Sequence, residues 1–165
     1  MTDNILQSQI EKGRLTDSGS FPKVILIDTI SFCDLKCSMC GHKDMTRKRG
    51  KMAMELFKKI IDEIADTDRN TRVWMVFFGE ALILKKTTLS PMIQYAKNKG
   101  LTDVVLNSNA NLLDQDAAEG LIKAGLDAIY VGVDAFTEET YAKVRVEGDY
   151  HKVVRNVKNL IKLKK

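Results

Sequence analysis

The chain alternates short apolar runs with longer segments in which hydrophobic residues recur every three to four positions. Short apolar runs predict β-strands, and longer amphipathic segments predict helices. The predicted strands cover residues 24–27, 73–78, 104–106 and 128–133. The first of them, Val24-Ile25-Leu26-Ile27, is apolar at every position, which is typical of a strand buried on both faces.

Capping residues and glycines mark the ends of the predicted helices. Residues 55–65 carry their apolar side chains on one face and predict the first helix. The second begins at Ser90-Pro91, a cap followed by a first-turn proline, and ends at Gly100. The remaining signals, in chain order, are a cap at Asp114 with a terminating glycine at Gly125, a helical turn that starts at Thr137, and a cap at Asp149.

Strands and helices therefore alternate about four times along the chain. This order predicts an α/β fold in which parallel strands are joined by right-handed crossovers. A length of 165 residues suits one domain, which we place at residues 23–165 after a polar leader at residues 1–22. In such sheets and barrels, ligands bind at the carboxyl ends of the strands, so we expect functional residues there.

Composition and charge exclude several classes of protein. The chain is 44% hydrophobic, which is enough for a core, and no run is long or apolar enough to span a bilayer. No secretory signal opens the sequence, so we expect a cytoplasmic protein without a membrane partner. The net charge of +4 is modest, and no aromatic residue interrupts the basic stretch at residues 43–51, so nucleic-acid binding is not expected.

All three cysteines lie in one loop after the first predicted strand, with Cys33, Cys37 and Cys40 spaced C-x3-C-x2-C. Thiolates are soft metal ligands, and a [4Fe–4S] cluster normally takes four of them. Three would leave one iron open to a small molecule. The alternative is a structural zinc loop with His42 as fourth ligand, although such loops more often use C-x2-C pairs separated by a longer stretch. The odd number of cysteines argues against a disulfide framework.

This cysteine spacing after an apolar strand resembles the radical S-adenosylmethionine (radical SAM) superfamily, and the resemblance runs from about Lys23 to the end of the chain. It implies an oxidoreductase-type enzyme in which the three cysteines hold a [4Fe–4S] cluster and the open iron chelates SAM. The reduced cluster would cleave SAM to methionine and a 5′-deoxyadenosyl radical, which abstracts hydrogen from an unknown small-molecule or peptide substrate. An electron donor such as flavodoxin or ferredoxin is implied as a partner.

The ends of the second and third predicted strands resemble further motifs of the family. In Phe78-Gly79-Glu80-Ala81, Gly79 and Glu80 match a Gly-Gly-Glu-Pro motif whose backbone and carboxylate bind the amino group of SAM. In Asn107-Ser108-Asn109-Ala110, Asn109 matches the asparagine of a Thr-Asn-Gly or Thr-Asn-Ala segment. Asn107 and Asn109 are short polar groups able to hydrogen-bond a ribose or carboxylate. From the residues alone, both stretches also fit ordinary turns.

The fourth predicted strand ends in Gly132-Val133-Asp134-Ala135, and Arg145 follows. The family usually has Ser-x-Asp-Gly or Ser-x-Asp-Ala here, and its serine and a later arginine bind the carboxylate of SAM. The resemblance therefore implies that Asp134 and Arg145 line SAM, while Gly132 removes one hydrogen bond. Met39 takes the place of the family's bulky residue beside adenine. By itself, Arg145 also fits a surface arginine at a helix end.

Within the family, this chain most resembles the branch that carries a SPASM or twitch domain. That domain contains further cysteines, and no cysteine follows Cys40 here. Its barrel is six-stranded, whereas four strands are predicted. We therefore expect a partial TIM-type barrel of about four parallel strand–helix units, with an uncovered inner face and an open edge through which the chain self-associates. Such a chain alone is expected to be a poor enzyme. The alternatives are a non-catalytic fragment or remnant that keeps the cluster and SAM motif, or the zinc-loop protein.

The basic stretch at residues 43–51 has two interpretations. Runs of charge are usually solvated loops. The other interpretation is a positive rim that attracts an anionic substrate or offsets the charge of a thiolate-bound cluster.

Overall fold

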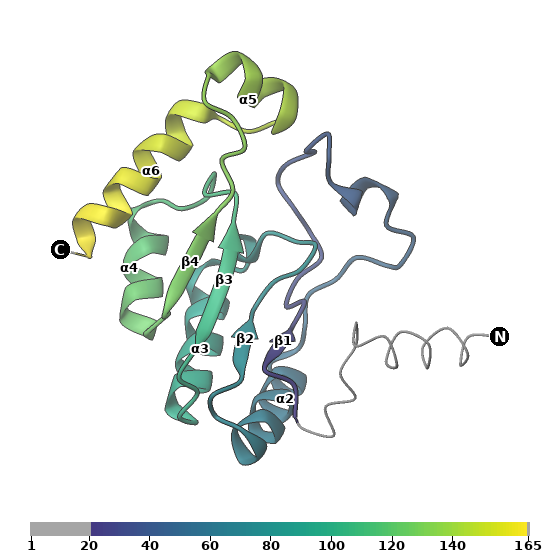
Figure 1. Cartoon of the computed structure of the whole chain (residues 1–165), viewed down its shortest axis with the longest axis vertical. Helices are drawn as coiled ribbons and strands as arrows, with labels where there is room; N and C mark the ends of the chain where they lie inside the picture. The colour runs from purple at the N-terminus through teal and green to yellow at the C-terminus, as the bar shows by residue number, and fades with distance from the viewer. Residues whose placement is uncertain (1–20, 165) are drawn as a thin grey trace, which may run out of the picture.

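A computed structural model describes residues 21–164, so most of the predicted leader lies outside the described part of the chain. The centre of the fold is a four-stranded parallel sheet whose strands follow one another in chain order, β1-β2-β3-β4 (Figure 1). The strands are β1 Val24–Leu26, β2 Arg72–Trp74, β3 Val104–Ser108 and β4 Ala128–Val131. The predicted parallel order is confirmed, although β1, β2 and β4 end earlier than the apolar runs suggested and β3 continues to Ser108.

Helices follow each strand. They are α2 Met54–Thr67, α3 Lys85–Asn98, α4 Gln115–Ala124, α5 Glu138–Val144 and α6 Tyr150–Leu163, with two 3-10 helices, η1 Gly41–Asp44 and η2 Ala81–Leu84. The predicted helix starts at Asp114, Thr137 and Asp149 are confirmed, because each of these side chains accepts a hydrogen bond from a backbone N–H in the first turn. Within residues 21–164, none of the helices is both long and apolar enough to cross a bilayer.

The two faces of the sheet have different surroundings. Right-handed crossovers between sequential parallel strands place the connecting helices on one face, where α2, α3 and α4 lie (Figure 1). Phe57 of α2 and Met92 of α3 are fully buried against that face. On the other face, Val24, Leu26 and Tyr130 are 45%, 52% and 43% exposed. The prediction that the first strand is buried on both faces is therefore wrong, whereas the expected uncovered inner face is present.

The predicted start of the second helix is also wrong. Helix α3 begins at Lys85, and Pro91 lies inside it. Ser90 does not act as a cap, because its Oγ is buried without a hydrogen-bond partner within residues 21–164. A proline inside a helix costs about 3 kcal/mol relative to alanine. Burial of Leu89, Met92 and other residues along one face of α3 offsets that cost, so tertiary packing overrides the local signal.

Candidate functional site

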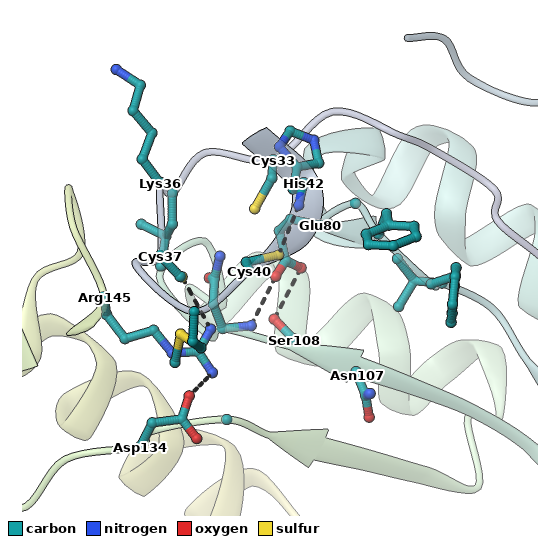
Figure 2. Close-up of a pocket in the computed structure, with 18 of the residues that line it drawn as sticks. Cys33, Lys36, Cys37, Cys40, His42, Glu80, Asn107, Ser108, Asp134 and Arg145 are labelled. Atoms are coloured by element: carbon teal, nitrogen blue, oxygen red, sulfur yellow. Dashed lines mark hydrogen bonds and ion pairs between the residues drawn. The ribbon is translucent and has the colours of Figure 1, made fainter. Parts of the chain in front are cut away.

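The carboxyl ends of the strands open into one cavity of about 750 Å³, which the loop of residues 33–40, here called the cysteine loop, closes on one side (Figure 2). Every residue that the sequence assigned to the cluster or to SAM lines this cavity. These residues are Cys33, Cys37, Met39, Cys40, Gly79, Glu80, Asn107, Asn109, Asp134 and Arg145. They come from the connections after β1, β2 and β4 and from the end of β3 with the turn after it, so the topology gathers them at one edge of the sheet.

The cysteine loop is held against the end of α5 and the segment that follows it. Lys36 N donates to Val146 O at 3.0 Å, and Ser38 N donates to Val144 O at 2.9 Å. Figure 1 shows the same arrangement, with the connection between β1 and α2 reaching toward α5. All three cysteines are free thiols. Burial raises the pKa of Cys33 to about 11, so this thiol is protonated at neutral pH and would have to lose its proton to bind a metal.

The three thiols fit a cluster better than they fit one zinc ion. Within residues 21–164, no three Cys, His, Asp or Glu side chains are grouped so that they could hold one metal ion. His42, the fourth ligand in the zinc hypothesis, places Nε2 2.9 Å from the carbonyl oxygen of Ser31 and hydrogen-bonds to it. In a [4Fe–4S] cluster each thiolate binds a different iron, so thiols that share a cavity without sharing one point suit that group.

Glu80 lies at the base of the cavity and is only 2% exposed. Its Oε1 accepts hydrogen bonds from Leu82 N and Ser108 Oγ, each at 3.0 Å, and its Oε2 accepts one from Asn109 N at 2.8 Å. Burial raises the pKa of Glu80 to about 7 despite these donors. Gly79 precedes it where a Cβ would overlap the carbonyl oxygen of Ile30, so the glycine is required by close backbone approach.

Asn107, near the end of β3, and Asn109, just after it, have different surroundings. Asn107 is exposed on the cavity side, and Figure 2 shows it apart from the bonded groups. The Asn109 amide is bonded within the protein at both ends. Its Nδ2 donates to Asp34 Oδ1 at 2.8 Å, and its Oδ1 accepts from Asn111 N at 2.8 Å. The sequence predicted Asn109 as a ligand-binding side chain, and it did not predict these two protein contacts.

Arg145 forms the wall on the β4 side (Figure 2). One guanidinium nitrogen is ion-paired with Asp134, and Nη1 donates to Cys37 Sγ at 3.4 Å. Its Nε is buried without a partner within residues 21–164. A Cβ on Gly132 would overlap the guanidinium. Gly132 therefore makes room for Arg145, a coupling that comparison with the family's serine at this position did not predict.

The sequence allowed two interpretations of the basic stretch at residues 43–51, a solvated loop or a positive rim. In the structure, some of its residues fit the first and some fit the second. Lys43 and Arg49 line the cavity, as does Lys36 from the cysteine loop. Arg47 instead pairs with Asp28, and neither of these two residues lines the cavity. Part of the stretch thus forms a positive rim at the cavity.

Comparison with known proteins identifies relatives over most of the chain. Residues 27–165 match the family described as Radical SAM superfamily. A protein named probable GTP 3′,8-cyclase from Methanococcus vannielii is 33% identical over 130 residues, which cover 78% of this chain and 42% of the relative. The tungsten-containing aldehyde ferredoxin oxidoreductase cofactor-modifying protein of Pyrococcus furiosus is 27% identical over 116 residues, covering 68% and 31%. The chain spans less than half the length of these curated relatives.

A solved structure shares the fold over nearly the whole chain. SuiB of Streptococcus suis bound to S-adenosylmethionine aligns with a TM-score of 0.73 at 16% identity, covering 96% of this chain and 35% of SuiB. Identity at this level establishes the fold alone. Together with the parallel sheet, the likeness confirms the predicted partial (β/α) barrel.

Proposed function

Because this chain belongs to the radical SAM superfamily, we propose that it is the cluster- and SAM-binding core of an oxidoreductase-type enzyme, with residues 23–165 as the core domain. Cys33, Cys37 and Cys40 each bind one iron of a [4Fe–4S] cluster and leave the fourth iron to SAM. When bound, the two cofactors supply reductive cleavage of SAM and a 5′-deoxyadenosyl radical for hydrogen abstraction. The carrying observation is three free thiols in one cavity lined by every motif residue.

The SAM side of the proposal rests on the β4 wall. The planar guanidinium of Arg145 suits a carboxylate, and its present partner Asp134 is 40% exposed, so an incoming carboxylate can take that place. Gly79 lets the backbone approach the ligand, and Met39 offers a polarizable apolar surface beside adenine. We assign Asn107 to a polar group of SAM, because it is exposed toward the cavity. Glu80 and Asn109 contribute to SAM binding indirectly, because they hold the ends of β2 and β3 in place.

The rim supports a substrate with anionic groups. Lys36, Lys43 and Arg49 line the cavity, and positive charge raises the local concentration of an anion. The relatives named GTP 3′,8-cyclase favour a small-molecule substrate. SuiB, solved with the precursor peptide SuiA, supports a peptide substrate as the alternative. We further propose a flavodoxin- or ferredoxin-type electron donor and a reducing, cytoplasmic setting, which preserves the three thiols.

The test of this function is anaerobic reconstitution with iron and sulfide, followed by a SAM-cleavage assay with a chemical reductant. We expect about four irons per chain, the content of one cluster, and formation of 5′-deoxyadenosine. The Cys37→Ala variant should lose both, because one ligand is missing. Purification with one tightly held zinc and no iron uptake would support the zinc loop and contradict the proposal.

The exposed inner face favours a second candidate, a module that keeps the cluster and SAM without efficient turnover. Val24, Leu26 and Tyr130 present apolar surface on that face, and water that reaches the cavity can divert a radical. We propose that the chain self-associates through the open edge of the sheet. Light scattering should then show an oligomer. A monodisperse monomer that couples SAM cleavage to substrate turnover many times would overturn this second candidate.

A further inference from the structure

Asp34 connects the cysteine loop to the turn after β3 through its side chain. Asp34, next to Cys33, accepts a hydrogen bond on each carboxylate oxygen. Asn109 Nδ2 donates to Oδ1 and Asn111 Nδ2 donates to Oδ2, both at 2.8 Å. The donors belong to the turn after β3, which is 75 and 77 residues away in sequence. This arrangement of one carboxylate and two amides is called the Asp34 clamp below.

The turn that carries the two donors is itself fixed. Asn109 Oδ1 accepts from Asn111 N at 2.8 Å, which closes a local turn. Asn156 of α6, only 5% exposed, donates from Nδ2 to Ala110 O at 2.8 Å. Ala110 has φ of +58°, a left-handed conformation that non-glycine residues seldom adopt. Glu80 Oε2 accepts from Asn109 N. Asp34 therefore connects the cysteine loop to a rigid part of the fold.

We propose that Asp34 is a positioning residue, which holds the cysteine loop in its metal-binding geometry before the metal arrives. The inference rests on the proposed cluster at the three cysteines. Groups that orient metal ligands from behind typically change metal affinity 10- to 100-fold when they are removed. Backbone bonds to Val144 and Val146 hold the loop from the α5 side, and the clamp holds it from the β3 side. With both present, the loop does not have to order when iron binds.

The clamp also changes the role of Asn109. Both polar atoms of its amide are bonded to the protein, so it acts on the cofactors through Asp34 and the turn. Asn109→Ala and Asp34→Ala therefore break the same connection. In a double-mutant cycle, the effects of the two substitutions on iron retention are strongly non-additive. A direct SAM ligand would instead give an Asn109→Ala variant that weakens SAM binding and leaves iron retention unchanged.

The experiment has one arm without metal and one with it. In the first arm, hydrogen–deuterium exchange of the apo chain follows the amides of the cysteine loop. Asp34→Ala should exchange at least about tenfold faster there, since two charge-assisted hydrogen bonds are lost. In the second arm, reconstituted protein is mixed with an iron chelator, and Asp34→Ala should lose iron about 10- to 100-fold faster.

Two matched variants separate the clamp from charge and from folding. The exchange Asp34→Asn with Asn111→Asp keeps the net charge and allows both hydrogen bonds, so it should restore slow exchange and slow iron loss. Asp44→Ala removes an exposed carboxylate nearby that makes no side-chain hydrogen bond within residues 21–164, and it should match wild type. Equal rates for Asp34→Ala and Asp44→Ala in the exchange arm would overturn the proposal. If the wild type takes up no iron, the cluster hypothesis fails, and the exchange arm still reads the clamp.

Discussion

Two carboxylates hold the β2–β3 wall of the cavity together: Glu80, which follows β2, and Asp34, which reaches the turn after β3 from the cysteine loop. Both accept hydrogen bonds on each of their two oxygens. On the β4 wall, Arg145 shares its guanidinium between Asp134 and Cys37 and leaves Nε without a partner in the described chain. The first wall is a scaffold whose polar groups are committed to the protein. The second can exchange a partner when a ligand arrives. Damage to the first should lower stability, and damage to the second should lower binding.

The largest expected effect is on the scaffold wall. Glu80→Ala leaves three hydrogen-bond donors in a buried site without their acceptor, and each such group costs about 1–3 kcal/mol. We expect the free energy of unfolding to fall by about 3 kcal/mol or more, measured by urea titration. Asp134→Ala is the matched change on the β4 wall and should lower stability by less than about 1 kcal/mol, because that pair is partly exposed. Equal losses would abolish the distinction between the walls.

The same carboxyl gives a pH dependence. Burial raises the pKa of Glu80 from its usual 4.5 to about 7, so the folded chain binds this proton more tightly than the unfolded chain. Its contribution to stability is complete below pH 4.5 and is lost as the pH rises through 7. Relative to Glu80→Gln, which does not titrate, wild type should lose up to about 3 kcal/mol across that window. If the free energy of unfolding changed equally with pH in the two proteins across this window, the prediction would be wrong.

On the β4 wall we expect binding to change. Arg145→Ala should weaken SAM binding to the reconstituted protein by about 10- to 100-fold, because a charge-assisted bond contributes roughly 1.5–3 kcal/mol. Asn107→Ala should weaken it only several-fold, since a neutral bond contributes about 1 kcal/mol. Equilibrium dialysis with labelled SAM measures both. Unchanged affinity in Arg145→Ala would remove Arg145 from the SAM site.

Gly132 tests the same wall more gently. Gly132→Ser would restore the family's hydroxyl, yet its Cβ overlaps the guanidinium of Arg145. We expect SAM affinity to fall by a few-fold, because displacing a packed side chain costs about 1 kcal/mol or more. Gly132→Ala adds the Cβ without the hydroxyl, so its SAM affinity should fall further. An increase in affinity for the serine variant would mean that Arg145 moves aside freely.

The sequence alone predicted that the site residues lie together. Parallel strands bring their carboxyl ends to one edge of the sheet, and each motif lies at the end of a predicted strand. It was insufficient where a distant partner decides the outcome. The Ser90-Pro91 signal predicted a helix start, and packing of the α3 face prevailed. The Asp34 clamp joins Asp34 to Asn109 and Asn111, which are 75 and 77 positions away in the sequence, and no motif spacing connects them. Gly132 was interpreted as a missing hydroxyl, whereas its role is to leave space for Arg145.

In the proposed function, three cysteines hold a cluster with one iron open to SAM inside this cavity. Electron paramagnetic resonance of the reduced, reconstituted chain tests it most directly, with SAM added in steps. We predict a cluster signal that changes on SAM addition, and a higher SAM concentration for the same change in Arg145→Ala. A cluster signal that is identical with and without saturating SAM would contradict the claim.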